Sequence, residues 1–169
     1  MAIIIDGKSL TVEDVIKVCR HGEEVVISEE AKAAVQKARD YVEKKLNDGA
    51  VIYGLTTGFG KFANVVIDHE QTAKLQRNLI ISHTCALGNP YPVEYVRAAM
   101  LLRCNALSRG NSGIRLSTLQ TMVDMLNKGV HPIIPEKGSL GASGDLAPLS
   151  HIALGLIGEG KQFATEADL

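Results

Sequence analysis

The tripeptide Ala142-Ser143-Gly144 has the residue types needed to build an electrophile from the main chain itself. If the backbone bends tightly there, the amide nitrogen of Gly144 can attack the carbonyl carbon of Ala142 and close a five-membered ring. Glycine at the attacking position lacks the Cβ that would crowd the approach and resist the required dihedral angles. Loss of two water molecules, one of them carrying the Ser143 hydroxyl, would leave an exocyclic methylidene. Because ordinary side chains supply no electrophile, enzymes usually take one from a cofactor.

The same residues also suit a purely structural role. They lie in a run of small residues, Gly138-Ser-Leu-Gly-Ala-Ser-Gly-Asp-Leu-Ala-Pro-Leu-Ser-His151. Gly-rich turns that lead into a capped helix are common. We expect Asp145 to be the N-cap of a helix that begins at Leu146, with Pro148 in the first turn, where a missing N–H does little harm. The residues alone therefore leave a capped turn and a self-made electrophile both open.

This run resembles the signature of the aromatic amino acid ammonia-lyases, and the likeness is closest to the histidine-specific members. In that family the matching Ala-Ser-Gly becomes the 4-methylidene-imidazol-5-one (MIO) group. The resemblance implies that Ala142, Ser143 and Gly144 form an MIO, without an external cofactor, and that ammonia is eliminated non-oxidatively from an amino acid. Covalent capture by the methylidene turns the amine into a better leaving group. The resemblance also implies a homotetramer with active sites built from several subunits.

A second stretch, Val51-Ile-Tyr-Gly-Leu-Thr-Thr-Gly-Phe-Gly60, is a Gly-rich loop without the Gly-Lys-Ser/Thr of a phosphate-binding loop. Taken by itself, Tyr53 there would be a half-buried residue that anchors the loop. The stretch also resembles the second signature of the family, in which the tyrosine is the catalytic base, and this implies that role for Tyr53. Free tyrosine titrates at about pH 10, so it needs positive charge or hydrogen-bond donors near its oxygen to act near neutrality.

His83 is the candidate for substrate recognition. A lone histidine on a helix is commonly a core or capping residue. The resemblance instead matches Ser82-His83 to the position where histidine-specific lyases carry a histidine that contacts the aromatic end of the substrate. Phenylalanine-specific members generally carry apolar residues there, and tyrosine-specific members can also carry histidine. Thr84 departs from the alanine of the histidine enzymes. L-Histidine, giving urocanate, is the expected substrate, and a tyrosine or phenylalanine lyase or an aminomutase stays open.

Composition narrows the class of protein. The chain has 169 residues, a net charge of −1 and 22% charged residues, which gives no electrostatic footprint for nucleic acid or an acidic membrane. The 46% apolar content with only 4% aromatic residues predicts an aliphatic core. Cys19, Cys85 and Cys104 form no C-x-x-C pair and indicate reduced thiols in a cytoplasmic protein. The sequence shows no signal peptide and no membrane-spanning apolar run of about 18 residues, so we expect neither a nucleic acid nor a membrane as partner. A small-molecule amino acid substrate is what the resemblance implies.

Two other chemistries are disfavoured. The segment Gly141-Ala-Ser-Gly-Asp145 has Asp where the G-x-S-x-G elbow of serine hydrolases needs glycine. Ser150 and His151 are successive helix residues that point different ways, so they cannot form a dyad. His83 and Cys85 are two residues apart with no second pair at ligand spacing, so no metal site is predicted.

The fold is predicted to be mainly α-helical, with a small β element at the N-terminus. We expect residues 1–169 to be one domain, the N-terminal portion of a longer lyase. Two alternatives to an active lyase stay open. The isolated chain could be a fragment in which the tripeptide is not compressed enough to cyclise, or it could be a non-catalytic assembly or regulatory module. The expected elements are a hairpin over 2–10 around Asp6-Gly7, a helix capped by Thr11 with Val12, Val15, Ile16 and Cys19 on one face, a strand over 24–27, helices over 28–47, 68–86, 93–108, 116–127 and from 146, and an extended segment over 130–135.

Overall fold

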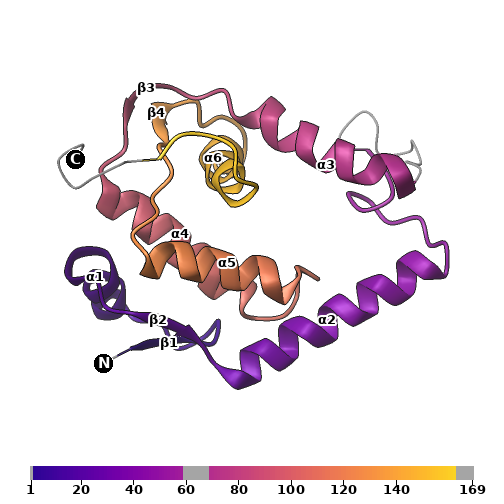
Figure 1. The fold of residues 1–169 in the computed structure, drawn as a ribbon, viewed down its shortest axis with the longest axis horizontal. Coiled ribbons are helices and arrows are strands. Elements are labelled where there is room, and N and C mark those ends of the chain that lie inside the picture. The colour runs from indigo at the N-terminus through magenta and orange to yellow at the C-terminus, as the bar shows by residue number, and fades with distance from the viewer. Residues whose placement is uncertain (1, 59–68, 163–169) are drawn as a thin grey trace.

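The computed structural model describes residues 2–58 and 69–162 and is mainly helical (Figure 1). Helices α4 and α5 lie side by side in the middle, and α2 runs along one edge of the molecule. In the described ranges, no helix has the length and apolarity needed to cross a membrane. The elements are β1 (Ile3–Ile5), α1 (Val12–His21), β2 (Val25–Ile27), α2 (Glu29–Asn47), α3 (His69–His83), β3 (Leu87–Pro90), α4 (Val93–Leu107), α5 (Leu116–Asn127), β4 (Pro135–Lys137) and α6 (Leu146–Leu156).

The predicted N-terminal hairpin is wrong. Strand β1 pairs in parallel with β2, with Ile3 opposite Val25, and α1 is the connection between them. A two-residue turn can join only antiparallel strands, whereas parallel strands need a crossover. The Asp6 carboxylate accepts hydrogen bonds from the backbone N–H groups of Lys8 (2.7 Å) and Ser9 (2.8 Å), and so directs the chain toward the helix. The strand predicted over 24–27 is confirmed as β2.

Helix α1 begins as predicted, and the face that it buries agrees only in part with the predicted one. Thr11 and Asp14 form a complete capping box at its start. The buried residue of the helix is Val18, whereas Val12 is 71% exposed and Ile16 is 39% exposed. Val15, which packs against the core, and the partly buried Cys19 lie on the inward side as predicted, whereas Val12 and Ile16 do not, so the inward face is shifted toward Val18 and α4, against which α1 packs.

The core is aliphatic, as predicted, and is centred on α4 and α5. Met100 and Leu101 of α4 and Leu119 of α5 are fully buried. One charged side chain lies among them: Arg97 is 8% exposed and donates hydrogen bonds to the carbonyls of Val18 (3.1 and 2.6 Å) and Leu126 (3.1 Å). These carbonyls belong to the last turns of α1 and α5, where the backbone C=O groups lack a regular intrahelical N–H partner. By binding them, Arg97 of α4 connects the ends of α1 and α5 to α4.

The other helices agree with the periodicity except at the C-terminal end of α3. Ser28 caps α2, and α4 and α5 lie where they were predicted. The start predicted at residue 68 lies outside the described residues. The helix ends at His83 rather than Ala86, because the chain turns into β3, which pairs antiparallel with β4. The segment over 130–135, predicted to be extended, leads into β4 and forms a bridge between Pro132 and Gln162.

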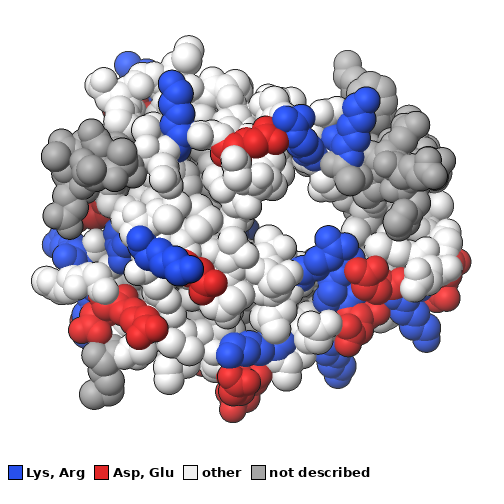
Figure 2. All heavy atoms as spheres, in the orientation of Figure 1, with Lys and Arg blue, Asp and Glu red and all other residues white. Residues whose placement is uncertain are grey.

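Charged residues of both signs are mixed over the face that Figure 2 shows, without a single-sign patch. The arrangement agrees with the net charge of −1. Electrostatic attraction of a polyanion needs a concentrated field of one sign, and this face does not provide one.

Candidate active site

The loop between β4 and α6 bends sharply at the predicted reactive tripeptide. Gly141 and Gly144 have φ values of +104° and +72°, a region that residues with a Cβ rarely adopt. The Ser139 hydroxyl donates a hydrogen bond to the carbonyl of Gly144 and so closes the loop across five residues. A Cβ at position 144 would lie 3.0 Å from the Ser139 oxygen. The loop therefore requires glycine at the position whose nitrogen would attack, and this agrees with the steric demand of ring closure.

Asp145 occupies the N-cap position of α6, as predicted, but its side chain does not cap the helix. The carboxylate accepts a hydrogen bond from the Ser143 hydroxyl at 2.5 Å and one from the Arg103 guanidinium at 3.2 Å. A capping side chain bonds the N–H of the second or third helical residue, and the third here is Pro148, which has none. The hydrogen bond from Ser143, with a smaller contribution from Arg103, lowers the pKa of Asp145 and keeps it ionised at neutral pH.

The reactive loop is fixed to the end of α3. A Cβ on Gly138 would lie 2.7 Å from the Cα of Ala86, so the backbones of the two segments are in contact there. The pairing of β3 with β4 and the hydrogen bond from the Tyr91 hydroxyl to the carbonyl of Glu136 (3.2 Å) hold this approach. Residues 86 and 138, far apart in the sequence, are thereby made neighbours.

His83 ends α3, close to this contact. Its Nδ1 lies 2.9 Å from the carbonyl oxygen of Leu79. A carbonyl can only accept, so this contact places a proton on Nδ1 and leaves Nε2 as the acceptor of the neutral ring. The side chain is half-buried, so Nε2 is oriented by the helix rather than by solvent. Such a nitrogen can accept a hydrogen bond from an N–H or O–H of a ligand.

Tyr53 lies in a turn that two threonines hold. The Thr56 hydroxyl accepts the N–H of Ile52 (2.8 Å), and the Thr57 hydroxyl accepts the N–H of Gly54 (3.2 Å). The turn contacts α3, because the Gln76 amide donates to the carbonyl of Gly54 at 3.3 Å. Tyr53 itself is 63% exposed. It is therefore not a half-buried residue that anchors the loop, which was the alternative to a catalytic role.

Helix α3 is the element that the three predicted parts share. The turn of Tyr53 contacts it at Gln76, His83 ends it, and the reactive loop contacts the chain just after it. Gln76 and His83 are seven residues apart, which corresponds to about 10 Å along the helix axis. Helix α6, which follows the reactive loop, also packs on α3. The turn that contains Tyr53, the residue His83 and the start of the loop that contains the tripeptide thus all adjoin α3 or the residues just after it.

The surroundings of the loop are apolar and open. Leu140 is 88% exposed, Leu87 is 74% exposed and Leu146 is 56% exposed. Exposed apolar patches on proteins commonly mark sites of contact with another surface. Charge-separating chemistry also benefits from the exclusion of water, which this loop does not achieve by itself.

The sequence predicted no site role for three residues near the loop, which are Arg103, Ser139 and His151. The contact between Arg103 and Asp145 could not be predicted, because the position of Asp145 indicated that its side chain would cap α6. His151 lies on α6 as predicted, but its Nε2 is buried with no hydrogen-bond partner in the described part of the chain, and burial lowers the pKa of the ring. Within the described ranges, no three His, Cys, Asp or Glu side chains are arranged to hold a metal ion.

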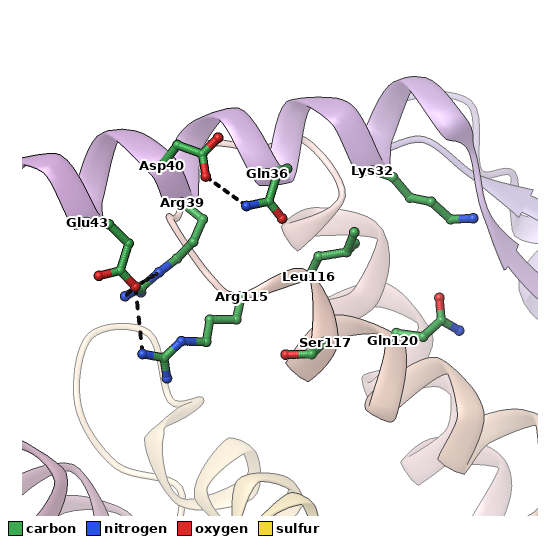
Figure 3. A pocket seen from close by; sticks show the side chains of 9 residues that line it. All are labelled: Lys32, Gln36, Arg39, Asp40, Glu43, Arg115, Leu116, Ser117 and Gln120. Carbon is green, nitrogen blue, oxygen red and sulfur yellow. Dashed lines mark hydrogen bonds and ion pairs between the residues drawn. The ribbon is translucent and has the colours of Figure 1, made fainter.

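A separate cleft of about 670 Å³ lies between α2 and the start of α5 (Figure 3). Its polar groups bind one another: Arg39 pairs with Glu43 and donates to the carbonyl of Gly113 (3.3 Å), and Arg115 lies 3.8 Å from the same Glu43 carboxylate. None of the predicted site residues lines it. The reactive tripeptide, not this cleft, is therefore the candidate active site.

Residues 10–168 match the family model described as aromatic amino acid lyase. The chain belongs to the aromatic amino acid lyase family. Over 161 residues it is 58% identical to the histidine ammonia-lyase of Caldanaerobacter subterraneus, which corresponds to 95% of this chain and 32% of the relative. The chain thus spans about a third of the length of the curated relatives it matches.

Solved structures of lyases and aminomutases share the fold. The histidine ammonia-lyase of Trypanosoma cruzi superposes with a TM-score of 0.85 at 42% identity, over 96% of this chain and 30% of that one. The tyrosine aminomutase of Streptomyces globisporus gives 0.89 at 37% identity, over the same share of each chain. The predicted fold class, a mainly helical part of the aromatic amino acid lyase fold, is confirmed.

Proposed function

We propose that this chain is the MIO-bearing N-terminal domain, residues 1–169, of a histidine ammonia-lyase that converts L-histidine to urocanate and ammonia. The observation that carries the proposal is the 58% identity to a histidine ammonia-lyase over 95% of the chain. The bent, glycine-dependent loop at Ala142-Ser143-Gly144 and its closure by Ser139 support ring formation at this position. Residues 142–144 would thus make the prosthetic group, and no external cofactor is required.

Each predicted residue has a role in this proposal. Once formed, the MIO supplies the electrophile that makes the substrate's amine a better leaving group. Tyr53 takes the proton from the β carbon as the Cα–N bond breaks, so that a carbon–carbon double bond and ammonia result. The Nε2 of His83 accepts a hydrogen bond from the N–H of the substrate imidazole. The protonated Nδ1, held by Leu79, supports this assignment because it leaves Nε2 as the acceptor.

We further propose that the open site is completed by protein surface outside this chain, in a homotetramer. The exposed Leu87, Leu140 and Leu146 support this proposal, because burial of these side chains would also exclude water from the loop. By itself, the 169-residue chain is then expected to bind histidine weakly and to turn it over slowly or not at all. We also propose a cytoplasmic location, supported by three cysteines that are free thiols in the structure.

The first test is the intact mass of the purified protein, because cyclisation removes two water molecules. The second is product analysis with histidine, tyrosine and phenylalanine in the complete enzyme, where urocanate should dominate. Replacing Ser143 by alanine removes the hydroxyl that leaves in the second dehydration, so Ser143→Ala should lower kcat by about three orders of magnitude or more. Near-normal turnover in that variant, or an unmodified mass of the wild type, contradicts the proposal.

A tyrosine aminomutase is the second candidate. It is favoured by the TM-score of 0.89 to such an enzyme. The identity to that enzyme is 37%, against 58% to a histidine ammonia-lyase, and this difference places histidine first. An aminomutase would release a β-amino acid instead of free ammonia, so an ammonia assay separates the two reactions.

A further inference from the structure

We propose that Arg103 of α4 is a positioning residue for ring formation at Ala142-Ser143-Gly144 and that it acts through Asp145. The inference rests on the proposed function, because it requires that the ring forms. Arg103 does not touch the reacting atoms. Its guanidinium is 3.2 Å from one carboxylate oxygen of Asp145, whose other oxygen is 2.5 Å from the Ser143 hydroxyl.

The first argument is that the side chain of Asp145 does not cap α6, although the residue occupies the N-cap position. An aspartate at an N-cap ordinarily accepts a hydrogen bond from an N–H of the helix that it begins, and this bond stabilises the helix. Asp145 occupies this position without a capping bond, while Pro148 removes the N–H of the third helical residue. Departures from local rules of this kind are concentrated at functional sites. Here the carboxylate binds the tripeptide instead.

The second argument concerns what the carboxylate holds. The bond between the side chains of Ser143 and Asp145 spans Gly144, and the Ser139 hydroxyl binds the carbonyl of Gly144. The residue whose nitrogen attacks is therefore restrained from both sides at φ +72°. Restraint of two reacting groups near their reactive geometry lowers the entropic part of the barrier.

The third argument is that the carboxylate needs an anchor. The Asp145 side chain is 45% exposed and would otherwise exchange between the Ser143 hydroxyl and solvent. Arg103 projects from α4, whose neighbouring residues Met100, Leu101 and Cys104 are fully buried. The guanidinium therefore starts from a rigid helix of the core and fixes the orientation of the carboxylate. The loop receives its alignment from α4 rather than from its own flexible backbone.

The chemistry that this alignment serves is balanced without an oxidant. The Gly144 nitrogen forms a bond to the Ala142 carbonyl carbon, and the carbonyl oxygen leaves as water with the amide protons of Gly144 and Ser143. The second water takes the Cα proton and the hydroxyl of Ser143 and leaves a carbon–carbon double bond. Arg103 neither gives nor takes a proton in these steps. Its effect is expected in the rate of ring formation.

The test follows the mass of the protein against time after cell-free synthesis. Arg103→Gln removes the charge and should slow the loss of the two water molecules about fivefold. A change of this size is the most that the loss of one solvent-exposed ion pair is expected to produce. Arg103→Lys keeps a cation on α4 and should restore most of the rate. The matched control is Arg77→Gln, which removes an exposed pair with Glu159 (2.7 and 2.9 Å) after α6 without touching the loop.

Slow cyclisation in Arg103→Gln, with Arg103→Lys and Arg77→Gln close to the wild type, supports the inference. An unchanged rate in Arg103→Gln overturns it, and so does equal slowing in Arg77→Gln, which indicates loosened packing. Thermal unfolding of each variant is measured alongside, and Arg103→Lys decides the matter if Arg103→Gln does not fold. A wild-type protein that never loses the two waters overturns the proposed function and this inference together, whereas the other failures overturn only the inference.

Discussion

Acidification should destabilise this fold through His131, because its ring must be neutral to accept a hydrogen bond from Arg97. The Arg97 guanidinium donates to Nε2 of His131 at 2.7 Å, and a guanidinium has no acceptor to offer in return. Arg97 is 8% exposed, and its other hydrogen bonds go to the carbonyls of Val18 and Leu126. Protonation of His131 would place two cations in contact at the junction of α1, α4 and α5.

The size of the effect follows from the pKa. Burial, and then the nearby charge of Arg97, lower the pKa of His131 from 6.5 to about 4. Because the unfolded chain binds this proton more readily, the free energy of unfolding is unaffected above about pH 7 and falls as the pH drops from 6.5 toward 4. A shift of this size corresponds to about 3 kcal/mol at most, and since the ring is only half-buried, screening by solvent reduces the effect to about 1–2 kcal/mol.

The assay is urea unfolding at pH 7.5, 6.5, 5.5 and 4.5. Carboxylates also lose stability at low pH, so the comparison is between the wild type and His131→Gln, whose amide oxygen can accept from Arg97 at every pH. We expect the wild type to lose about 1–2 kcal/mol more than His131→Gln between pH 7.5 and 4.5. His21→Gln, at the exposed end of α1, should follow the wild type. Parallel pH profiles for the wild type and His131→Gln would refute the reasoning.

Three further outcomes are expected. Tyr53→Phe in the complete lyase should lower kcat by about 10²- to 10⁴-fold with little change in substrate binding, because it removes the base, and an unchanged kcat would exclude that role. His83→Leu should reduce kcat/KM for histidine about tenfold or more relative to phenylalanine, and an unchanged ratio of the two would move recognition elsewhere. Gly110→Ala should lower the free energy of unfolding by about 2–4 kcal/mol, since its Cβ would lie 2.6 Å from the backbone of Ala34 at φ +71°. Gly22→Ala, at φ +68° with nothing within 4 Å, should cost only about 1 kcal/mol, and equal losses at the two positions would contradict the steric argument.

The long helices were predictable because their signals are local. Apolar spacing and the caps Thr11 and Ser28 define α1 and α2 within a few residues, and the structure has both caps. The hairpin failed because Asp6-Gly7 is a local turn signal, whereas the partner of β1 lies more than twenty residues along the chain. Which side of a short helix faces inward is likewise decided by its neighbour. Packing on α4 buries Val18 and leaves Val12 in solvent.

The candidate site shows the same division between local and long-range information. The sequence motif locates the tripeptide and Tyr53, yet nothing in the spacing indicates that Gln76 holds the turn of Tyr53 or that Ala86 contacts Gly138. Such contacts depend on how α3 is placed against β4 and α6. The sequence predicts the reacting groups, and the tertiary fold decides which of them share a surface.

Asp145 shows why a local rule can be right about a position and wrong about a side chain. Residue type and place both favour an N-cap, and the backbone of α6 does begin there. Two other partners compete for the same carboxylate: the Ser143 hydroxyl two residues back and Arg103 on a different helix. These two charge-assisted bonds together outweigh the single bond, also charge-assisted, that a cap would provide, so the carboxylate turns toward the loop. The resulting loss of a cap weakens the first turn of α6, which directly follows the loop that contains Ala142-Ser143-Gly144.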